Sequence, residues 1–517
     1  KGARPAIRSK PDYECFGSRL CENVRSDRIP PWYRRGFLMK RFIEGVDRSQ
    51  STLFPECLED YIAEDNPVRV IDVFVDELDL GGLGFGRVEP RATGRPGYQP
   101  SVLLKLYIYG YLNRVQSSRR LEREAGRNIE VMWLTGRLVP DHKTIADFRK
   151  DNGPAIRKVC ARFVTLCRRL ELFADASVAI DGSKFKAVNT RDRNFTRAKM
   201  KRRMEQIEES VERYLHQLDS ADRQEPSRAR ATKTVRLKDK IATLKEEMRR
   251  LEKLEARMLA TPDRQISLTD PDARSMATSG RGSGMVGYNV QAAVDTKHHL
   301  IVAHEVTNVG TDRSQLSSLA KRTKTALETE ALDVVADRGY FNSEQILACE
   351  EAGITVTLPK PLTSNNKAKG RFVKQDFRYV KEEDVYICPA GERLVYRYTN
   401  EEKGLTLRRY WTVACHRCAI KDRCTTGHER RITRWEHEHV LEAVQQRLDE
   451  HPEKMRQRRE TVEHPFGTIK SWMGSTHFQT KTLKRVGTEM ALHVLAYNLK
   501  RAMNIMGIAP LIAAMGA

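Results

Sequence analysis

Long apolar runs are missing from this sequence of 517 residues. It contains no stretch of about eighteen consecutive apolar residues, which excludes an ordinary transmembrane helix. Residues 1–40 are polar, basic and contain proline, so they do not fit a secretory signal peptide. Cysteine is also scarce: the ten cysteines are scattered apart from one group. This pattern favours a cytoplasmic protein with reduced thiols and no membrane partner.

Acidic residues are too few to balance the basic ones. The chain has 69 Asp and Glu against 91 Lys and Arg, a formal net charge of +22 and a pI near 9.6. Such a balance excludes an acidic protein and favours a polyanionic partner, with nucleic acid as the first candidate. A non-specifically basic protein and a membrane-surface binder are the alternatives. The length predicts two to four domains.

Three acidic residues stand in unusual contexts. Asp181 follows the apolar run 176–180, Asp337 follows the apolar run 332–336, and Glu463 lies within a basic segment. A carboxylate at the end of a buried strand is costly unless a charge or a metal compensates it. Two such strands side by side would bring two carboxylates together. A third from a helix would complete a cage of oxygen ligands, which hard divalent cations prefer.

The segment around Glu463 predicts a basic helix face. Arg459 precedes Glu463 by four residues and Lys470 follows it by seven, so the three fall on one side of a helix. The two cations would suit phosphate and would hold the carboxylate ionised. An ordinary surface stripe of ion pairs is the alternative. Pro465 predicts a kink or the start of a new segment.

The first half of the chain reads as helical. Short helices are expected across residues 98–172, and Arg119, Arg120 and Arg123 lie on one of them. This pattern is compatible with a helix-turn-helix that contacts DNA, although a simple packing unit gives the same signal. Residues 197–260 carry an interrupted heptad pattern that predicts an antiparallel helical hairpin. The hairpin would serve dimerisation, DNA clamping or simple spacing.

The second half alternates between strand and helix patterns. Strands are expected at 288–295 and 300–306, before Asp337, and at 354–358, with helices at 314–327 and from 343 onward. With the strand before Asp181, this order predicts an α/β fold in which helices cover a mixed sheet.

One group of cysteines has metal-ligand spacing. Cys415, Cys418 and Cys424 form a Cys-x2-Cys-x5-Cys pattern, and Cys388 is a candidate fourth member. Four thiolates would suit structural zinc. An iron–sulfur cluster and ordinary reduced cysteines are the alternatives. The group lies in an insertion at 381–435, separate from the three carboxylates.

Four short blocks, in this order, resemble those of bacterial insertion-sequence transposases of the DDE type. The blocks are residues 179–182 (AIDG), 287–291 (GYNVQ), 336–340 (ADRGY) and 462–470 (VEHPFGTIK). The resemblance covers roughly residues 39–510 and implies a ribonuclease-H-like catalytic domain. The Asp, Asp and Glu of the family fall on Asp181, Asp337 and Glu463. In its Tyr-Arg-Glu-Lys helix motif, Arg459, Glu463 and Lys470 match, and Arg456 takes the tyrosine position.

The resemblance also implies a reaction. The three carboxylates would hold two Mg²⁺ or Mn²⁺ ions about 4 Å apart and catalyse phosphoryl transfer on DNA. Water would free a 3′-hydroxyl at the element's end, and that hydroxyl would attack target DNA. Arg459, Lys470 and Arg338 would contact the phosphates. The implied partners are double-stranded DNA, namely the terminal inverted repeats and the target, and further copies of the chain in a homo-oligomer, on the chromosome in a bacterial cytoplasm.

The domain organisation follows from these patterns. Met39 offers a natural start, so residues 1–38 are expected to be a non-native or disordered extension. Residues 39–172 would form a helical DNA-binding domain. Residues 173–517 would form the catalytic domain, with the insertions 197–260 and 381–435. A domesticated relative that binds DNA without cutting it, and a nuclease or resolvase of the same fold, are the alternatives. The long helical region and the hairpin favour the transposase.

Overall fold

The computed structural model describes residues 57–89, 97–173, 176–189, 193–223, 228–261, 263–277, 284–361 and 365–516. The chain divides into two units, residues 1–57 and 58–517, and every element below belongs to the second. The extension expected at 1–38 lies outside the described residues.

Helices fill the N-terminal part, as the sequence predicts. Local signals fix their ends: the Asn66 side chain caps the first helix, whose first residue is Pro67, and the Asp141 side chain accepts hydrogen bonds from two backbone amides of a later one. These helices are α1 (Pro67–Asp76), α2 (Leu80–Leu83), α3 (Pro100–Leu112), α4 (Ser118–Ala125), α5 (Ile129–Thr135), α6 (His142–Asp151) and α7 (Gly153–Arg169).

A mixed six-stranded sheet forms the centre of the C-terminal part. Its order is β4-β5-β1-β7-β8, and β6 also pairs with β5. Strands β4, β6 and β1 run antiparallel to β5, whereas β1, β7 and β8 are mutually parallel. The strands are β1 (Ser177–Lys186), β4 (Arg274–Met276), β5 (Met285–Asp295), β6 (Ile301–Thr307), β7 (Leu332–Ala336) and β8 (Ile354–Thr357).

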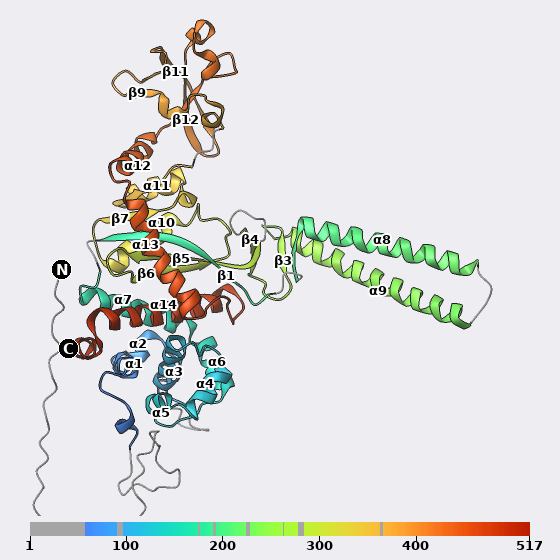
Figure 1. Cartoon of the computed structure of the whole chain (residues 1–517), viewed down its shortest axis with the longest axis vertical. Coiled ribbons are helices and arrows are strands. Elements are labelled where there is room, and N and C mark those ends of the chain that lie inside the picture. Colours follow the sequence, from blue (N-terminus) through green and yellow to red (C-terminus); the bar gives the residue numbers. More distant parts are fainter. Residues whose placement is uncertain are drawn as a thin grey trace, which may run out of the picture. The chain divides into compact units, whose positions relative to one another are not determined.

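Helices cover this sheet. α10 packs against β5 and β6, α13 packs against β1, β5 and β7, and α11 and α12 pack against β8 (Figure 1). The mixed sheet with covering helices that the sequence predicts is therefore confirmed. The helices are α10 (Leu316–Leu327), α11 (Ser343–Glu350), α12 (Glu438–Glu450), α13 (Lys454–Gly467), α14 (Leu483–Met506) and α15 (Ile508–Met515).

Two long helices lie side by side where the heptad pattern predicts a hairpin. They are α8 (Arg197–Asp222) and α9 (Arg228–Leu259), and the short paired strands β2 (Asn194–Thr196) and β3 (Gln265–Ser267) stand at their base (Figure 1). Arg203 of α8 and Glu247 of α9 form an ion pair of 2.8 Å. The apolar residues between the helices form a cluster of their own, which includes Ile207 and Leu251.

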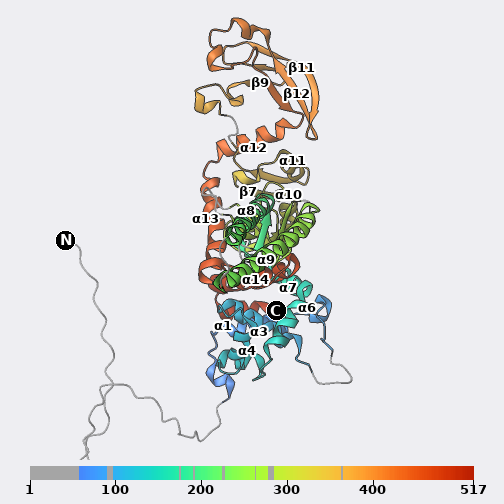
Figure 2. The same cartoon turned by 90° about the vertical axis from the view of Figure 1, so that its right-hand side faces the viewer.

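The cysteine-bearing insertion contains a second sheet, which the sequence patterns do not predict. Its five antiparallel strands follow each other in space as they do in the chain, and β11 and β12 lie side by side (Figure 2). It has its own small core, built around Tyr386 and Tyr410. The strands are β9 (Arg378–Val380), β10 (Val385–Ile387), β11 (Arg393–Glu402), β12 (Leu405–Trp411) and β13 (Ile432–Trp435).

The N-terminal helices and the central sheet share one core. α14 packs against α3, α7 and β6, and α15 packs against α1. Residues such as Leu106, Phe163, Tyr288 and Leu495 belong to one continuous hydrophobic cluster. The boundary expected after residue 172 is therefore not a gap between two cores. Across the described residues, no helix is both long and apolar enough to span a bilayer.

Candidate active site

Two of the three predicted carboxylates meet on neighbouring strands. β1 and β7 are parallel, and Ile180 pairs with Ala336, so the next residue of each chain segment is an aspartate. Asp337 follows the end of β7, as predicted. Asp181, however, does not end its strand: it still pairs with Ala292 of β5, and β1 continues to Lys186. The expectation of two strand-end carboxylates is corrected on this point, because β5 sustains β1 after β7 has ended.

A buried arginine joins the two aspartates. Arg458 of α13 places its Nη2 atom 2.8 Å from Oδ1 of Asp181 and 3.9 Å from Oδ2 of Asp337. Its side chain is only 12% exposed. Sequence reasoning gave Arg458 no role, and it assigned Arg459 to Glu463 and to phosphate. The helical period carried the signal, because Arg458 stands four residues before the buried Val462 and seven before the buried Pro465.

Burial makes the carboxyl group of Asp181 a weaker acid than an ordinary aspartate. Desolvation raises the pKa of its carboxyl group to about 6, with further increases from the charges of Asp337 and Asp312. The guanidinium of Arg458 and the amide of Gly182 act in the opposite direction without cancelling the effect. Arg458 therefore offsets only part of the cost of burying this carboxylate.

Asp312, which sequence reasoning also missed, organises the polar side chains behind Asp181. Its Oδ1 atom accepts hydrogen bonds from the side-chain amides of Asn289 and Gln291, both at 2.7 Å, and lies 3.4 Å from Nζ of Lys184. The Tyr340 hydroxyl donates to Oε1 of Gln291. No spacing rule links Asp312, in the segment after β6, to β1, so only the fold reveals this network.

Lys470 lies beside the carboxylates. Its Nζ atom is 2.6 Å from Oγ of Ser183 and 4.7 Å from the ring centre of Phe185. Burial lowers the pKa of Lys470, and the charge of Asp181 acts in the opposite direction. Lys470 is therefore close to the part of β1 that carries Asp181, and its contact with phosphate stays a prediction.

The remaining residues of the helix motif are exposed. Glu463 and Arg459 both lie on the solvent side of α13, and Arg338 is exposed beside Asp337. Among the described residues, no three His, Cys, Asp or Glu side chains are arranged to hold a metal ion. The structure thus brings Asp181 and Asp337 together, and Glu463 as the third ligand stays a prediction.

The helix continues past its proline. α13 runs through Pro465 to Gly467 and then widens into a π-helical turn at Thr468–Trp472. The expected break therefore comes after the proline, and Lys470 lies in that turn. His464 is bound to the Tyr497 hydroxyl at 2.8 Å, so it has a structural contact rather than a free ring.

The arginines predicted to contact DNA in the N-terminal region lie on α4. Arg119, Arg120 and Arg123 are all exposed, while Leu121 and Ala125 are buried and face the neighbouring helices. This division follows from the helical period. The exposed face is free of packing, and its contact with DNA stays a prediction.

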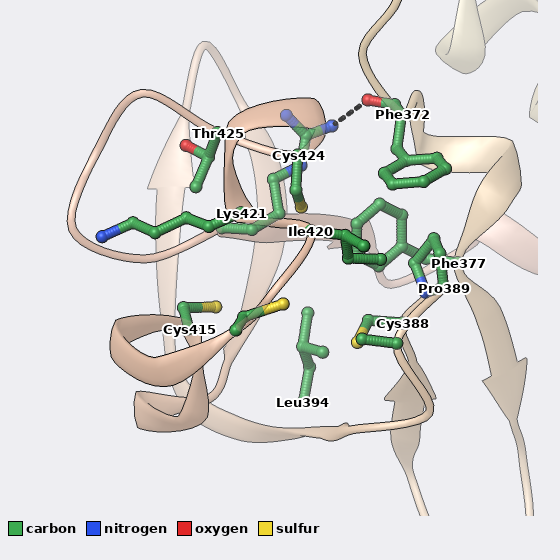
Figure 3. A pocket seen from close by; sticks show the side chains of 13 residues that line it. Phe372, Phe377, Cys388, Pro389, Leu394, Cys415, Ile420, Lys421, Cys424 and Thr425 are labelled. Carbon is green, nitrogen blue, oxygen red and sulfur yellow. Dashed lines mark hydrogen bonds between the residues drawn. The ribbon is translucent and has the colours of Figure 1, made fainter.

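The four predicted cysteines gather around one pocket in the second sheet. Cys388, Cys415, Cys418 and Cys424 line a cavity of about 20 Å³ together with apolar side chains such as Phe377 (Figure 3). Burial raises the pKa of Cys424, and the other three thiols, being close enough to act on it, raise it further. All four are free thiols. The fold therefore brings four cysteines from separate segments to one small pocket, although among the described residues no three of them are arranged to hold a metal ion.

Comparisons with known families agree with this geometry. Residues 56–151 match a family described as a transposase domain (DUF772), and residues 256–499 match the transposase DDE domain. These two matches define a DNA transposase of the DDE class, a family that generally uses divalent metal ions. The chain belongs to the DDE transposases of insertion sequences. Asp337 and Glu463 fall inside the second match, whereas Asp181 precedes it.

Other comparisons add little. No curated protein matches the chain. One solved structure, the cryo-EM synaptic complex of piggyBac transposase with hairpin DNA, is similar at 8% identity and a TM-score of 0.31, covering 87% of this chain and 79% of that one.

Proposed function

We propose that this transposase cuts DNA at the ends of its element and joins them to target DNA, using Asp181, Asp337 and Glu463. One observation carries the proposal: Asp181 and Asp337 come from neighbouring parallel strands and both lie near Arg458. Carboxylates brought so close repel each other unless a positive charge lies between them. A site built this way is suited to bind a divalent ion.

The ligand set that we propose is Asp181, Asp337 and Glu463 around two Mg²⁺ or Mn²⁺ ions. When bound, such ions polarise the phosphate and increase the acidity of the attacking hydroxyl. The raised pKa of Asp181 fits this role, because a nearby cation would favour its ionised form. Arg458 offsets part of the negative charge of the two aspartates.

Basic side chains around the site would hold the DNA backbone. Lys470 lies next to Ser183, and Arg338 adjoins Asp337. Arg459 shares the exposed face of α13 with Glu463. We propose that all three contact phosphates, which fixes the position of the scissile bond without reading base sequence. Arg119, Arg120 and Arg123 on α4 would bind DNA at a second place.

The strand order supports a ribonuclease-H-like catalytic domain. Three antiparallel strands, β6, β5 and β1, continue into the parallel strands β7 and β8, and helices pack on them. The helical N-terminal region and the α8–α9 hairpin favour a transposase over a nuclease or resolvase of this fold. A domesticated relative would still bind DNA, but the three carboxylates are all present.

The proposed partners are the terminal inverted repeats, the target DNA and further copies of this chain, in a bacterial cytoplasm. Two ends have to be held together for transfer, which an oligomer achieves. The net charge of +22 supports DNA as the main partner.

The test is metal-dependent cleavage of a duplex that carries the flanking ends of the gene. The wild-type chain is compared with Asp181→Asn, Asp337→Asn and Glu463→Gln, with Glu460→Gln as the matched control on the exposed part of α13. We expect cutting with Mg²⁺ or Mn²⁺ by the wild type and the control only, while all variants bind the duplex. Cutting by Glu463→Gln at the wild-type rate would remove Glu463 from the site, and binding without cutting by the wild type would favour the domesticated relative.

We also propose that Cys388, Cys415, Cys418 and Cys424 bind one structural zinc ion. The small core around Tyr386 and Tyr410 is thin, and small units often depend on a metal. Elemental analysis of the purified chain is expected to give about one zinc per molecule. The double variant Cys415→Ser, Cys418→Ser should lose it, whereas Cys349→Ser, at a buried thiol of another core, should keep it. If the purified chain contains no zinc, or if the double variant keeps as much zinc as the wild type, these residues are ordinary thiols.

A further inference from the structure

A partly exposed tryptophan in the second sheet is flanked by two arginines. Trp411 ends β12 and pairs with Val395 of β11. The guanidinium carbons of Arg397 and Arg431 lie 5.5 and 5.1 Å from the centre of its ring, within the range of a cation–π contact. Tyr398 packs edge-on against the same ring at 5.9 Å. We call these four residues the Trp411 cluster: Arg397, Tyr398, Trp411 and Arg431.

The cluster lies on the solvent side of the sheet. Neighbouring residues in a strand point to opposite faces, and Tyr410 is fully buried in the small core. Trp411 therefore faces away from that core. Arg397 and Arg431 are exposed, and Tyr398 is 45% exposed. An aromatic and cationic surface on a sheet that already has its core is not needed for packing.

The two arginines of the cluster differ from most of the arginines in the strands of this sheet. Four others are neutralised by acidic neighbours, in the pairs Arg393–Glu383, Arg408–Asp384, Arg409–Glu402 and Arg434–Glu442. Over the part of the chain that the structure describes, no acidic side chain pairs with Arg397 or Arg431. The cluster thus carries two uncompensated positive charges beside the exposed ring of Tyr398 and the partly exposed ring of Trp411.

We propose that the Trp411 cluster is a second DNA-binding surface, which grips the backbone of duplex DNA away from the catalytic carboxylates. This inference rests on the proposed function and assigns part of the DNA contact to the insertion. Guanidinium groups bind phosphate through paired hydrogen bonds, and the ring of Trp411 holds them in place before DNA arrives. Fewer side-chain motions are lost on binding, so the contact is stronger than one made by free arginines.

The charges favour DNA over a protein partner. A second copy of this chain would bring its own net charge of +22 against the cluster, whereas DNA brings a dense row of phosphates. Each phosphate contact releases a counterion, so the salt dependence of binding counts the contacts directly.

The experiment measures binding of the full chain to a duplex carrying the element's ends, over a series of salt concentrations. The double variant Arg397→Ala, Arg431→Ala is compared with Arg393→Ala, whose arginine lies on the same strand but is paired with Glu383. We expect the salt slope of the double variant to fall by about 1.8, and its affinity at physiological salt to fall on the order of 10–30-fold. Arg393→Ala should behave as the wild type. Trp411→Leu should weaken binding but keep the full salt slope, because both charges remain.

Each of the other possible results leads to a different conclusion. An unchanged slope and affinity in the double variant, with normal binding and cleavage by the wild type, would overturn this inference and leave the proposed function intact. Loss of self-association in the double variant, measured by light scattering, with unchanged DNA affinity would assign the cluster to a second copy instead. A wild-type chain that neither binds nor cuts its ends would overturn the proposed function itself.

Discussion

At the scale of single residues, the candidate site keeps an ionisable group at a position where its charged form lowers the stability of the fold. Asp181 is a partly buried carboxylate whose pKa stays near 6 even with Arg458 at 2.8 Å. The folded chain therefore holds this proton more tightly than the unfolded chain, where the pKa is 3.8. Stability from this group is present below that value and is lost as the pH rises through about 6.

Asp181→Asn is therefore expected to stabilise the metal-free protein at pH 7, on the order of 1–3 kcal/mol. The amide has the same shape and carries no charge that burial opposes. Urea unfolding in the presence of a chelator at pH 5 and pH 7 tests this, and the gain should shrink at pH 5. Added Mg²⁺ should stabilise the wild type and not the variant. A destabilised variant at pH 7 would mean that the bond to Arg458 outweighs the cost of burial.

Gly182 is a residue whose lack of a side chain matters. A Cβ atom here would lie 2.7 Å from Oδ1 of Asp312 and would also collide with the Gln291 amide. Gly182→Ala is expected to destabilise the chain by about 1–3 kcal/mol and to reduce cleavage, because the Asp312 network must shift. Gly310→Ala, with open space around its Cβ position, is the control. Thermal unfolding of the two variants measures the difference. Equal melting temperatures would show that the Asp312 network adjusts to the added methyl group at little cost.

Elements differ in how far they depend on the rest of the chain. The α8–α9 hairpin has its own apolar cluster, separate from the clusters that flank the central sheet. The heptad spacing makes such an element self-contained, since each helix buries its stripe against the other.

Replacing residues 204–253 by a short Gly/Ser linker is expected to change the melting temperature by no more than about 4 °C. The truncated hairpin keeps its base at β2 and β3. Calorimetry measures the change, and gel-shift binding of element ends on the same sample shows whether the hairpin serves DNA. A fall of the melting temperature well beyond that range would mean that the hairpin supports the central core.

The whole molecule is held together by helices from its two ends. α14 contributes fourteen buried residues to a core that also contains α3 and α7. Polar bonds reinforce this packing: the Asn498 side chain bonds both the amide and the carbonyl of Ile301, at 2.9 and 2.8 Å. The catalytic region is thus completed by the N-terminal helices.

A fragment of residues 173–517 is expected not to unfold cooperatively, because α14 would expose the apolar face that α3 and α7 cover. Adding residues 58–172 in trans should restore a cooperative transition in circular dichroism. The fragment 371–436 contains the second sheet and its own core. Supplied with zinc, it serves as the comparison for the fragment 173–517. Cooperative unfolding of residues 173–517 alone would contradict the shared core.

Local patterns in the sequence determined much of this protein. The heptads of α8 and α9, the apolar runs of β1 and β7 and the caps at Asn66 and Asp141 are set by residues close in the chain. The four family blocks placed Asp181 and Asp337 where the structure brings them together. Periodicity and short motifs carry such information because their physical causes are local.

Only the tertiary structure decided what depends on distant segments. It paired Arg458 with Asp181, brought Asp312 next to Asn289 and Gln291 of β5, and merged the N-terminal helices with α14 in one core. It also kept β1 extended past Asp181 because β5 pairs with it there. Contacts across hundreds of residues arise from packing and desolvation, for which no short-range pattern in the chain exists.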